Sequence, residues 1–397
     1  MKRNFLKNSE ISYRQTTKTE SNEQLLPLRI AFLDVGQADT IVITCPDTHE
    51  AIVVDCVDAD AVLDYLEAEH ITYLRGVIIT HLHADHYSGV TSLLSNYHHV
   101  PGLQECEIVI FNQVDRKKFD TLVRDPDLHD EGTKYGAKIL LSNLLQWCKQ
   151  GELEGKQRCS CLQVERRPIA LDGIWSKILH LLHPHFSDFP ILEAKGLNNV
   201  SGVFLVRGPG SSALLTGDLE PDGWQFLREN HPNLHSDVLK FPHHGAWKDG
   251  DVDSLLDSVQ PSIVIISVGS EGYKKYKHPN AHVFEALSTR PHIRVLCTQA
   301  TDQCQHHVQQ KAASVRLQLK AQARQTGFPV IGSKQGCPCA GTIIIELGKE
   351  ARILQPEPLF HQQSIIRGNF KEMHKCIIGA DLALEHMQIP QKSADGQ

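Results

Sequence analysis

VIITHLHADH, at residues 77–86, joins a continuous apolar run to a cluster of four potential metal ligands. The apolar half is typical of a buried strand, and side chains that follow a strand often line the rim of a pocket. In an extended loop, His81 and His83 point the same way and can share one metal ion, while Asp85 and His86 can begin a second site. Imidazole and carboxylate ligands suit zinc, manganese or iron. The stretch therefore predicts a metal centre rather than a chance run of polar residues.

Short apolar segments broken by Gly and Asp turns extend on both sides of this stretch. We expect strands at 28–33, 40–44, 51–54, 77–80, 107–111, 177–182, 203–206, 213–216, 238–241, 262–267, 294–297 and 342–347. Helices are expected at 59–69, 135–149, 223–230, 252–259 and 281–288. Strands in series with interleaved helices favour an α/β sandwich over separate domains.

The domain organisation follows from where this pattern stops. Residues 1–24 form a polar N-terminal tail, and residues 25–355 are expected to form the main domain. Two charged or Gln- and Lys-rich segments, near 115–167 and near 302–340, are interpreted as insertions. Residues 356–397 lack strong periodicity and are expected to form a C-terminal extension.

Composition excludes several classes of protein. The formal net charge of −7 disfavours a strongly basic nucleic-acid binder, although a local basic patch can still hold an anion. Eleven cysteines spread over 397 residues do not suit a secreted disulfide scaffold. No apolar run approaches the roughly 18 residues of a membrane span, and the polar start has no signal-peptide pattern. We therefore expect a cytoplasmic protein with no membrane span.

Further motifs appear in a fixed order around the histidine cluster. They are DVGQAD at 34–39, NNVS at 198–201, TGD at 216–218, HHG at 243–245 and HP at 278–279. Together with HLHADH, this set resembles the metallo-β-lactamase superfamily, and in particular its ComEC-like branch, over roughly residues 28–298. Ala38 stands where that branch has a glycine. The resemblance implies an α/β fold, the four-layer αββα metallo-β-lactamase sandwich.

The resemblance also implies a set of metal ligands. It assigns His81 and His83 to a first divalent ion, and Asp85, His86 and one or both of His243 and His244 to a second, with Asp218 bridging the two. Zinc or manganese is the expected metal, and the two ions would share a hydroxide that attacks the substrate. Asp85, His86 and Asp218 are accordingly the expected catalytic residues.

One superfamily ligand is missing from the pattern. Many members place another histidine before the bridging aspartate, where this chain has Asn199 and Ser201, as the ComEC-like branch does. We expect these two residues among the substrate contacts. His183 and His185 lie upstream and are alternative ligands, although a role at the end of a strand is the simpler interpretation for each.

Aromatic and basic residues alternate just before the HP motif, in YKKYKH at 273–278. Lys275, Lys277 and His278 are candidates to hold a phosphate backbone, and the tyrosines could stack on a base. A solvated lysine-rich loop remains the alternative.

A second cluster of soft ligands lies in the second insertion. Cys304, His306, Cys337 and Cys339 have a spacing that suits a closed structural zinc site. Such a site would stabilise a long polar segment that buries little apolar surface. Reduced cysteines scattered near the core are the alternative.

The leading functional hypothesis is a metal-dependent phosphodiesterase or nuclease. Its expected substrate is a phosphodiester, nucleic acid included. An acyl or thioester hydrolase of the same fold is a second hypothesis, because fold alone does not fix the substrate. A third is a metal-binding partner subunit of a defence or regulatory complex, which would require a protein partner. The sequence does not fix the oligomeric state.

Overall fold

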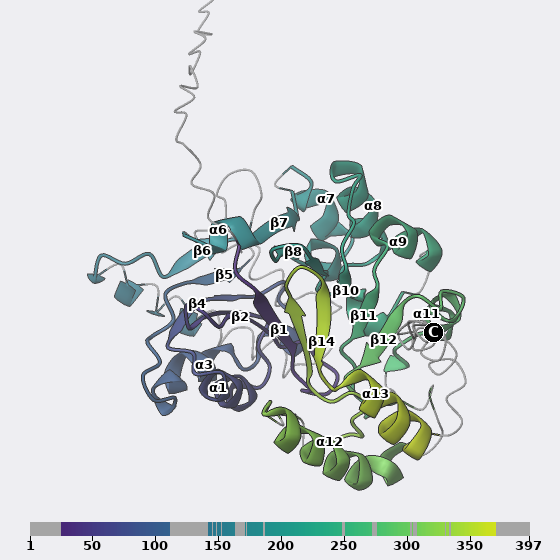
Figure 1. Ribbon diagram of the computed structural model, residues 1–397. Helices are drawn as coiled ribbons and strands as arrows, with labels where there is room; N and C mark the ends of the chain where they lie inside the picture. Colours follow the sequence, from purple (N-terminus) through teal and green to yellow (C-terminus); the bar gives the residue numbers. More distant parts are fainter. Residues whose placement is uncertain are drawn as a thin grey trace, which may run out of the picture.

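The computed structural model describes most of the chain and arranges it around two β-sheets (Figure 1). It describes residues 25–111, 142–144, 146–147, 149–151, 153–162, 171, 173–185, 187–247, 251–271, 276–301, 304, 308–329, 331–332 and 335–370. Within these residues no helix is long and apolar enough to cross a membrane.

The first sheet has the strand order β14-β13-β1-β2-β3-β4-β5-β6 among the described residues. Its strands are β1 (Leu28–Phe32), β2 (Ile41–Cys45), β3 (Glu50–Val54), β4 (Tyr73–Ile78), β5 (Val109–Phe111), β6 (Cys159–Cys161), β13 (Ile343–Leu347) and β14 (Ala351–Gln355). Pairing is antiparallel from β14 to β3 and parallel from β3 to β6.

The second sheet has the order β12-β11-β10-β9-β8-β7 in the described part of the chain. Its strands are β7 (Leu179–His183), β8 (Val203–Arg207), β9 (Ser212–Leu215), β10 (Val238–Lys240), β11 (Ile263–Ile266) and β12 (Arg294–Cys297). Strands β9 to β12 run parallel, so their carboxyl ends lie along one edge of the sheet.

Alternating apolar residues explain why the two sheets stack. Ile41 and Ile43 of β2 belong to a cluster that also contains Phe204 and Ile265 of the second sheet, whereas Val42 belongs to a cluster on the outer face of the first sheet. Because successive side chains of a strand point to opposite faces, each sheet buries one face against the other sheet and one face against helices.

Helices cover both outer faces (Figure 1). The longer helices are α1 (Ala59–Ala68), α3 (Val90–Asn96), α7 (Phe189–Ala194), α8 (Pro221–Asn230), α9 (Val252–Val259), α11 (Ala281–Ser288) and α12 (Ala312–Thr326). The short ones are α2 (Ala84–Tyr87), α6 (Trp175–Ile178), α13 (Pro358–Phe360), η1 (Tyr97–His99), η2 (Leu197–Val200), η3 (Pro242–Gly245), η4 (Val308–Lys311) and the π-helix η5 (His361–Arg367). Helices α1 and α3 pack on the first sheet, and α8, α9, α11 and α12 contribute to the cluster on the second.

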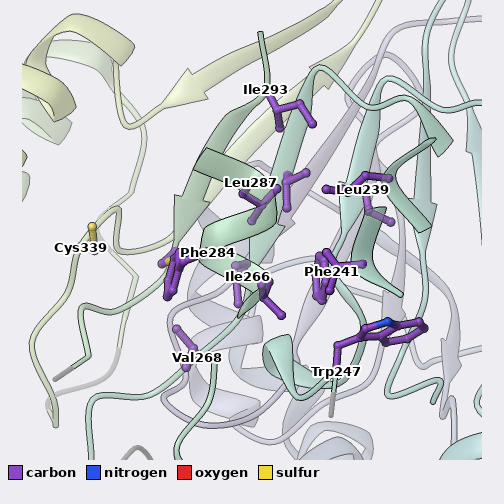
Figure 2. Close-up of a cluster of buried hydrophobic side chains, with 14 of the residues drawn as sticks. Leu239, Phe241, Trp247, Ile266, Val268, Phe284, Leu287, Ile293 and Cys339 are labelled. Carbon is purple, nitrogen blue, oxygen red and sulfur yellow. The ribbon is translucent and has the colours of Figure 1, made fainter. Parts of the chain in front are cut away.

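Figure 2 shows part of this second cluster, in which Phe284 and Leu287 of α11 lie beside Ile266 of β11. The order helix, sheet, sheet, helix confirms the expected αββα sandwich.

Several elements differ from the expectations. Strand β6 lies in the first segment interpreted as an insertion, yet it extends the first sheet by pairing with β5. Helix α12 lies in the second such segment, and η5, from the expected C-terminal extension, buries Ile365 and Ile366 against the second sheet's outer cluster. Lys177 was expected in a strand but lies in α6. Most of the helix expected at 135–149 lies outside the described residues.

Candidate metal centre

The histidine and aspartate motifs meet where strand ends from both sheets come together. HLHADH follows β4, TGD follows β9, and HHG follows β10. Backbone hydrogen bonds connect these loops to the second sheet and to one another: the amide of Gly202, just before β8, donates to the Thr80 carbonyl at 3.0 Å, and the amide of His243 donates to the Gly217 carbonyl at 3.1 Å. The predicted ligands therefore lie in one place because the two sheets bring their edges together.

His81 and His83 point their ring nitrogens at each other. Nε2 of His81 lies 2.9 Å from Nδ1 of His83, and Nδ1 of His81 lies 3.2 Å from the Thr80 hydroxyl. Burial, followed by the neighbouring charge of His86, holds the pKa of His81 well below its usual range. Neutral imidazole is the form that binds a metal, so burial keeps His81 in the form that the predicted first ion requires.

His86 is fully buried and is held by Asp55. Its Nδ1 lies 2.6 Å from Asp55 Oδ2, and Asp55 also accepts hydrogen bonds from the amide and hydroxyl of Thr80. Because Nδ1 is engaged, Nε2 is left to face Asp218 Oδ2 at 3.2 Å. This carboxylate–histidine arrangement fixes the tautomer and orientation of metal-ligating histidines. Sequence reasoning did not assign Asp55 any role.

His244 faces the same carboxylate from the other sheet. Its Nδ1 lies 2.8 Å from the Ser267 carbonyl oxygen, while its Nε2 lies 3.5 Å from Asp218 Oδ2 and 3.7 Å from Asp85 Oδ2. The Nε2 atoms of His86 and His244 are buried and make no hydrogen bond. Two buried ring nitrogens that converge on a carboxylate are suitable donors for a divalent cation.

The HHG turn orients the two adjacent histidines differently. His243 and His244 both have positive φ, 47° and 52°, which is rare for residues with side chains and is concentrated at functional sites. His243 is 22% exposed, and its Nε2 lies 3.8 Å from Asp218 Oδ2 while its Nδ1 lies 3.5 Å from Glu220 Oε1. His244 thus lies on the side of Asp85 and His86, and His243 flanks Asp218.

Asp39 and Lys240 lie behind the ligands, and sequence reasoning had assigned no site role to either. One atom from each of Asp39, His86, Asp218 and His244 lies within 4.8 Å of the others. However, Asp39 faces the Nδ1 atoms of both histidines, at 3.9 Å, rather than their Nε2 atoms. Its ion-pair partner is the ammonium group of Lys240. We therefore assign Asp39 to the support of the ligands rather than to the ion itself.

The sequence of the chain matches a known protein superfamily. Residues 33–249, more than half of the chain, match the family model for the metallo-β-lactamase superfamily. The chain belongs to the metallo-β-lactamase superfamily. The match includes the three loops that carry HLHADH, TGD and HHG.

Two curated proteins are similar to parts of the chain. The chain is 25% identical over 304 residues to ComE operon protein 3 of Bacillus subtilis (strain 168), an overlap that covers 72% of this chain and 34% of that protein. The chain thus spans about a third of this relative. It is 53% identical over 55 residues to the hydroxyacylglutathione hydrolase of Hahella chejuensis, over 14% of this chain and 21% of that enzyme.

Two solved structures are also similar. The metallo-β-lactamase fold protein YhfI from Bacillus subtilis has a TM-score of 0.35 at 12% identity, over 60% of this chain and 85% of its own. A diphosphatase from the PhnP family has a TM-score of 0.33 at 13% identity, over 61% of this chain and 85% of its own.

Asn199 and Ser201, the residues that stand where many superfamily members have a histidine, hydrogen-bond the backbone around Asp218 and the start of α8. Both are buried, with 1% and 0% of their surface exposed. The Ser201 hydroxyl accepts a hydrogen bond from the Asp218 amide, and Asn199 Oδ1 accepts one from the Gly223 amide. Ser201 therefore supports the turn that carries Asp218, and Asn199 supports the first turn of α8. Their role as substrate contacts stays a prediction.

The alternative ligands are engaged elsewhere. His183 is buried with its Nε2 2.8 Å from the Asn199 carbonyl oxygen, and burial lowers its pKa to about 4. His185 Nδ1 lies 3.1 Å from the Ser187 hydroxyl. Neither belongs to the cluster around Asp218.

A short aromatic series leads outward from the centre. The His278 ring lies 5.5 Å from the His243 ring, and the Tyr276 ring stacks on His278 at 5.9 Å with an interplanar angle of 17°. Tyr276 is 46% exposed and Lys277 is also exposed. The loop therefore borders the site, beyond the end of the superfamily match. Lys275 lies outside the described residues.

The candidate structural zinc site is only partly described. Cys337 and Cys339 are buried, and Cys304 packs against the same apolar cluster, at whose edge Figure 2 shows Cys339. Among the described residues these cysteines are not part of a group of three ligands within 4.8 Å of one another. His306 lies outside the described residues, so this zinc site stays a prediction.

Proposed function

We propose that the protein is a phosphodiesterase, with nucleic acid among its substrates, that uses two divalent ions, zinc or manganese. The observation that carries this proposal is the convergence on Asp218 of the buried Nε2 atoms of His86 and His244. His81 Nε2 and His83 Nδ1 would hold a first ion, and Asp85, His86 and His244 a second. Asp218 would contact both. His243 lies close enough to Asp218 to supplement the first site, where the usual third histidine is missing.

The charges of the site support two ions and an anionic substrate. Asp39, Asp55 and Asp218 are buried, and the Asp85 side chain is 41% exposed at the mouth. Lys240 is the ammonium group that contacts this set in the described residues. One divalent ion would leave a buried negative excess, which is costly in a low dielectric. Two ions would leave the site slightly positive and suited to the single negative charge of a phosphodiester.

Divalent ions in such a site lower the pKa of water towards about 7 and stabilise negative charge on a phosphoryl oxygen. The chain contributes orientation. Asp85 is the most exposed of the proposed ligands of the second ion, so its free oxygen can accept a hydrogen bond from the attacking water. Lys277 lies at the mouth, where its ammonium group can contact a neighbouring phosphate, and the exposed face of Tyr276 can stack on a base.

Thioester hydrolysis is the second candidate, favoured by the short region of 53% identity to a hydroxyacylglutathione hydrolase. Both reactions would use the same ions and the same ligands. The two substrates differ in the groups that would face the exposed residues Tyr276 and Lys277. An aromatic and a basic side chain suit a nucleotide better than a thioester.

The test is a substrate screen with the full chain loaded with zinc or manganese. It compares single-stranded and duplex nucleic acid, a simple phosphodiester and a glutathione thioester. We expect phosphodiester hydrolysis that falls by at least about 10³-fold in Asp85→Ala and His86→Ala. His98→Ala, which removes an exposed histidine on η1, is the matched control and should keep full activity. Thioester turnover without phosphodiester turnover would contradict the proposal.

A further inference from the structure

Lys240 is fully buried beneath the candidate metal centre. It ends β10, three residues before His243, and none of its surface is exposed. Its Nζ donates a hydrogen bond to the Gly217 carbonyl at 2.7 Å and forms an ion pair with Asp39. Burial alone would lower the pKa of Lys240, but the charges of Asp39 and Asp218 raise it above its usual value. The ammonium form is therefore held in place from several sides.

The same ammonium group contacts one particular oxygen of Asp218. Lys240 Nζ lies 3.7 Å from Asp218 Oδ1, whereas the nitrogens of His86 and His244 lie 3.2 and 3.5 Å from Oδ2. The two oxygens of Asp218 thus have separate surroundings. Lys240 Nζ thus hydrogen-bonds the carbonyl of Gly217, the residue before Asp218, and lies within ion-pair distance of the Asp218 carboxylate, so it can restrain both the turn and the side chain.

We propose that Lys240 is a positioning residue of the metal centre, which holds Asp218 so that Oδ2 is presented to the ions, and that Asp39 holds Lys240 in place. This inference rests on the proposed metal centre. The alternative is that Lys240 and Asp39 form a structural ion pair that merely happens to lie close to the ligands. A buried pair of that kind stabilises a fold only when both partners are present.

A double variant distinguishes the positioning role from the structural ion pair, because the two predict different recoveries of melting temperature and of metal binding. Lys240→Met leaves Asp39 buried without its partner, so the melting temperature of the metal-free chain should fall under either interpretation. Lys240→Met combined with Asp39→Asn removes the unpaired charge, and the melting temperature should recover. The orientation of Asp218 should not recover, because its contact with Lys240 is still missing.

The experiment titrates the metal-free full chain with cobalt(II) and with zinc, and records affinity, stoichiometry and the visible spectrum of bound cobalt(II). We expect Lys240→Met and the double variant to bind at least one ion about 10- to 100-fold more weakly, with a changed cobalt spectrum. Asp39→Asn keeps Lys240 and an oxygen acceptor, and should change the cobalt spectrum less than Lys240→Met does. Arg158→Met, which removes a buried cation that pairs with Glu105, controls for a general loss of stability.

Three results would overturn the inference. Recovery of both melting temperature and metal binding in the double variant would show a structural pair only. Tighter binding in Lys240→Met would show a purely electrostatic effect, since removing a positive charge attracts cations. The double variant can also fail to regain its melting temperature. In that case, identical cobalt spectra of Lys240→Met and Asp39→Asn would contradict the role of Lys240 in positioning Asp218. Failure of the wild-type chain to bind either ion would instead contradict the proposed metal centre.

Discussion

Asp55 contacts His86, a candidate metal ligand, but is not itself a candidate ligand. This position predicts how much Asp55 contributes to metal affinity. It accepts hydrogen bonds from His86 Nδ1 and from the amide and hydroxyl of Thr80. Asp55→Asn keeps the size but removes the charge that orients His86, so we expect about 10- to 100-fold weaker metal binding. Calorimetric titration with zinc measures this. Asp60→Asn, an exposed residue of α1, is the control, and equal affinities in both variants would contradict the assignment.

Asp34 predicts a pH dependence outside the metal ligands. Burial raises its pKa to about 7, against the opposing effects of a hydrogen bond from Gln299 and of the Gly36 amide. The unfolded chain releases this proton near pH 4, so the folded state loses stability as the pH rises from about 4 to about 7. Asp34→Asn removes this loss. Between pH 4 and pH 8 the free energy of unfolding of wild type should therefore fall by about 4 kcal/mol more than that of Asp34→Asn.

Urea unfolding of both proteins at pH 4, 6 and 8 measures the effect. Since the remaining titrating groups are common to both chains, the difference between them isolates Asp34. Parallel stability curves over this range would show that the Asp34 carboxyl is ionised in the folded protein.

At the residue scale, the candidate metal ligands could be predicted from the sequence, but the residues that hold those ligands in place could not. His81, His83, Asp85 and His86 are close in sequence, and their type and spacing point to metal binding. Lys240 and Asp55 are instead a buried lysine and a strand-end aspartate, which acquire a role only through contacts with residues far away in the chain. Asp39 ends the DVGQAD motif, which was recognised in the sequence. That its carboxylate faces the Nδ1 atoms of His86 and His244 can be seen only in the structure.

At the scale of elements, the HHG turn depends on Gly245. Its φ is +83°, and a Cβ atom there would lie 2.5 Å from the Cβ of Pro279. Gly245→Ala should therefore destabilise the fold by more than the roughly 1–2 kcal/mol of a left-handed alanine, and displace His244. Gly327→Ala is the matched control, because Gly327 has a φ of +78° with no atom near its Cβ position.

Thermal unfolding and zinc affinity of the two glycine variants test this. We expect both to lose stability but Gly245→Ala alone to lose zinc affinity. Equal losses of stability, with zinc binding intact in each, would contradict the role of the close contact with Pro279.

Two of the elements that sequence reasoning missed, α12 and β6, have patterns that are hard to recognise. Helix α12 buries Val315, Leu319 and Ala323 in a narrow stripe, and most of its other residues are polar. Such a stripe is hard to distinguish from a solvated segment. Strand β6 has three residues, too few for a period of two to be visible. Central strands such as β2 and β11 were predictable because their residues run almost continuously apolar.

At the scale of the whole molecule, the candidate centre joins the two halves of the sandwich. Asp55, His81 and His86 follow strands of the first sheet, whereas Asp218 and His244 follow strands of the second. The order of motifs along the chain indicated that these residues belong together. The stacking of two sheets with their strand ends on one side explains why residues more than a hundred positions apart can share an ion.

Metal content of the purified full chain tests this account most directly. Elemental analysis after loading with zinc or manganese should find about two ions per wild-type chain, and fewer in His81→Ala, which alters the first sheet's ligands, and in His244→Ala, which alters the second's. His98→Ala should keep the wild-type content. A wild-type chain that holds no ion, or variants that hold as much as wild type, would contradict a metal centre built from both sheets.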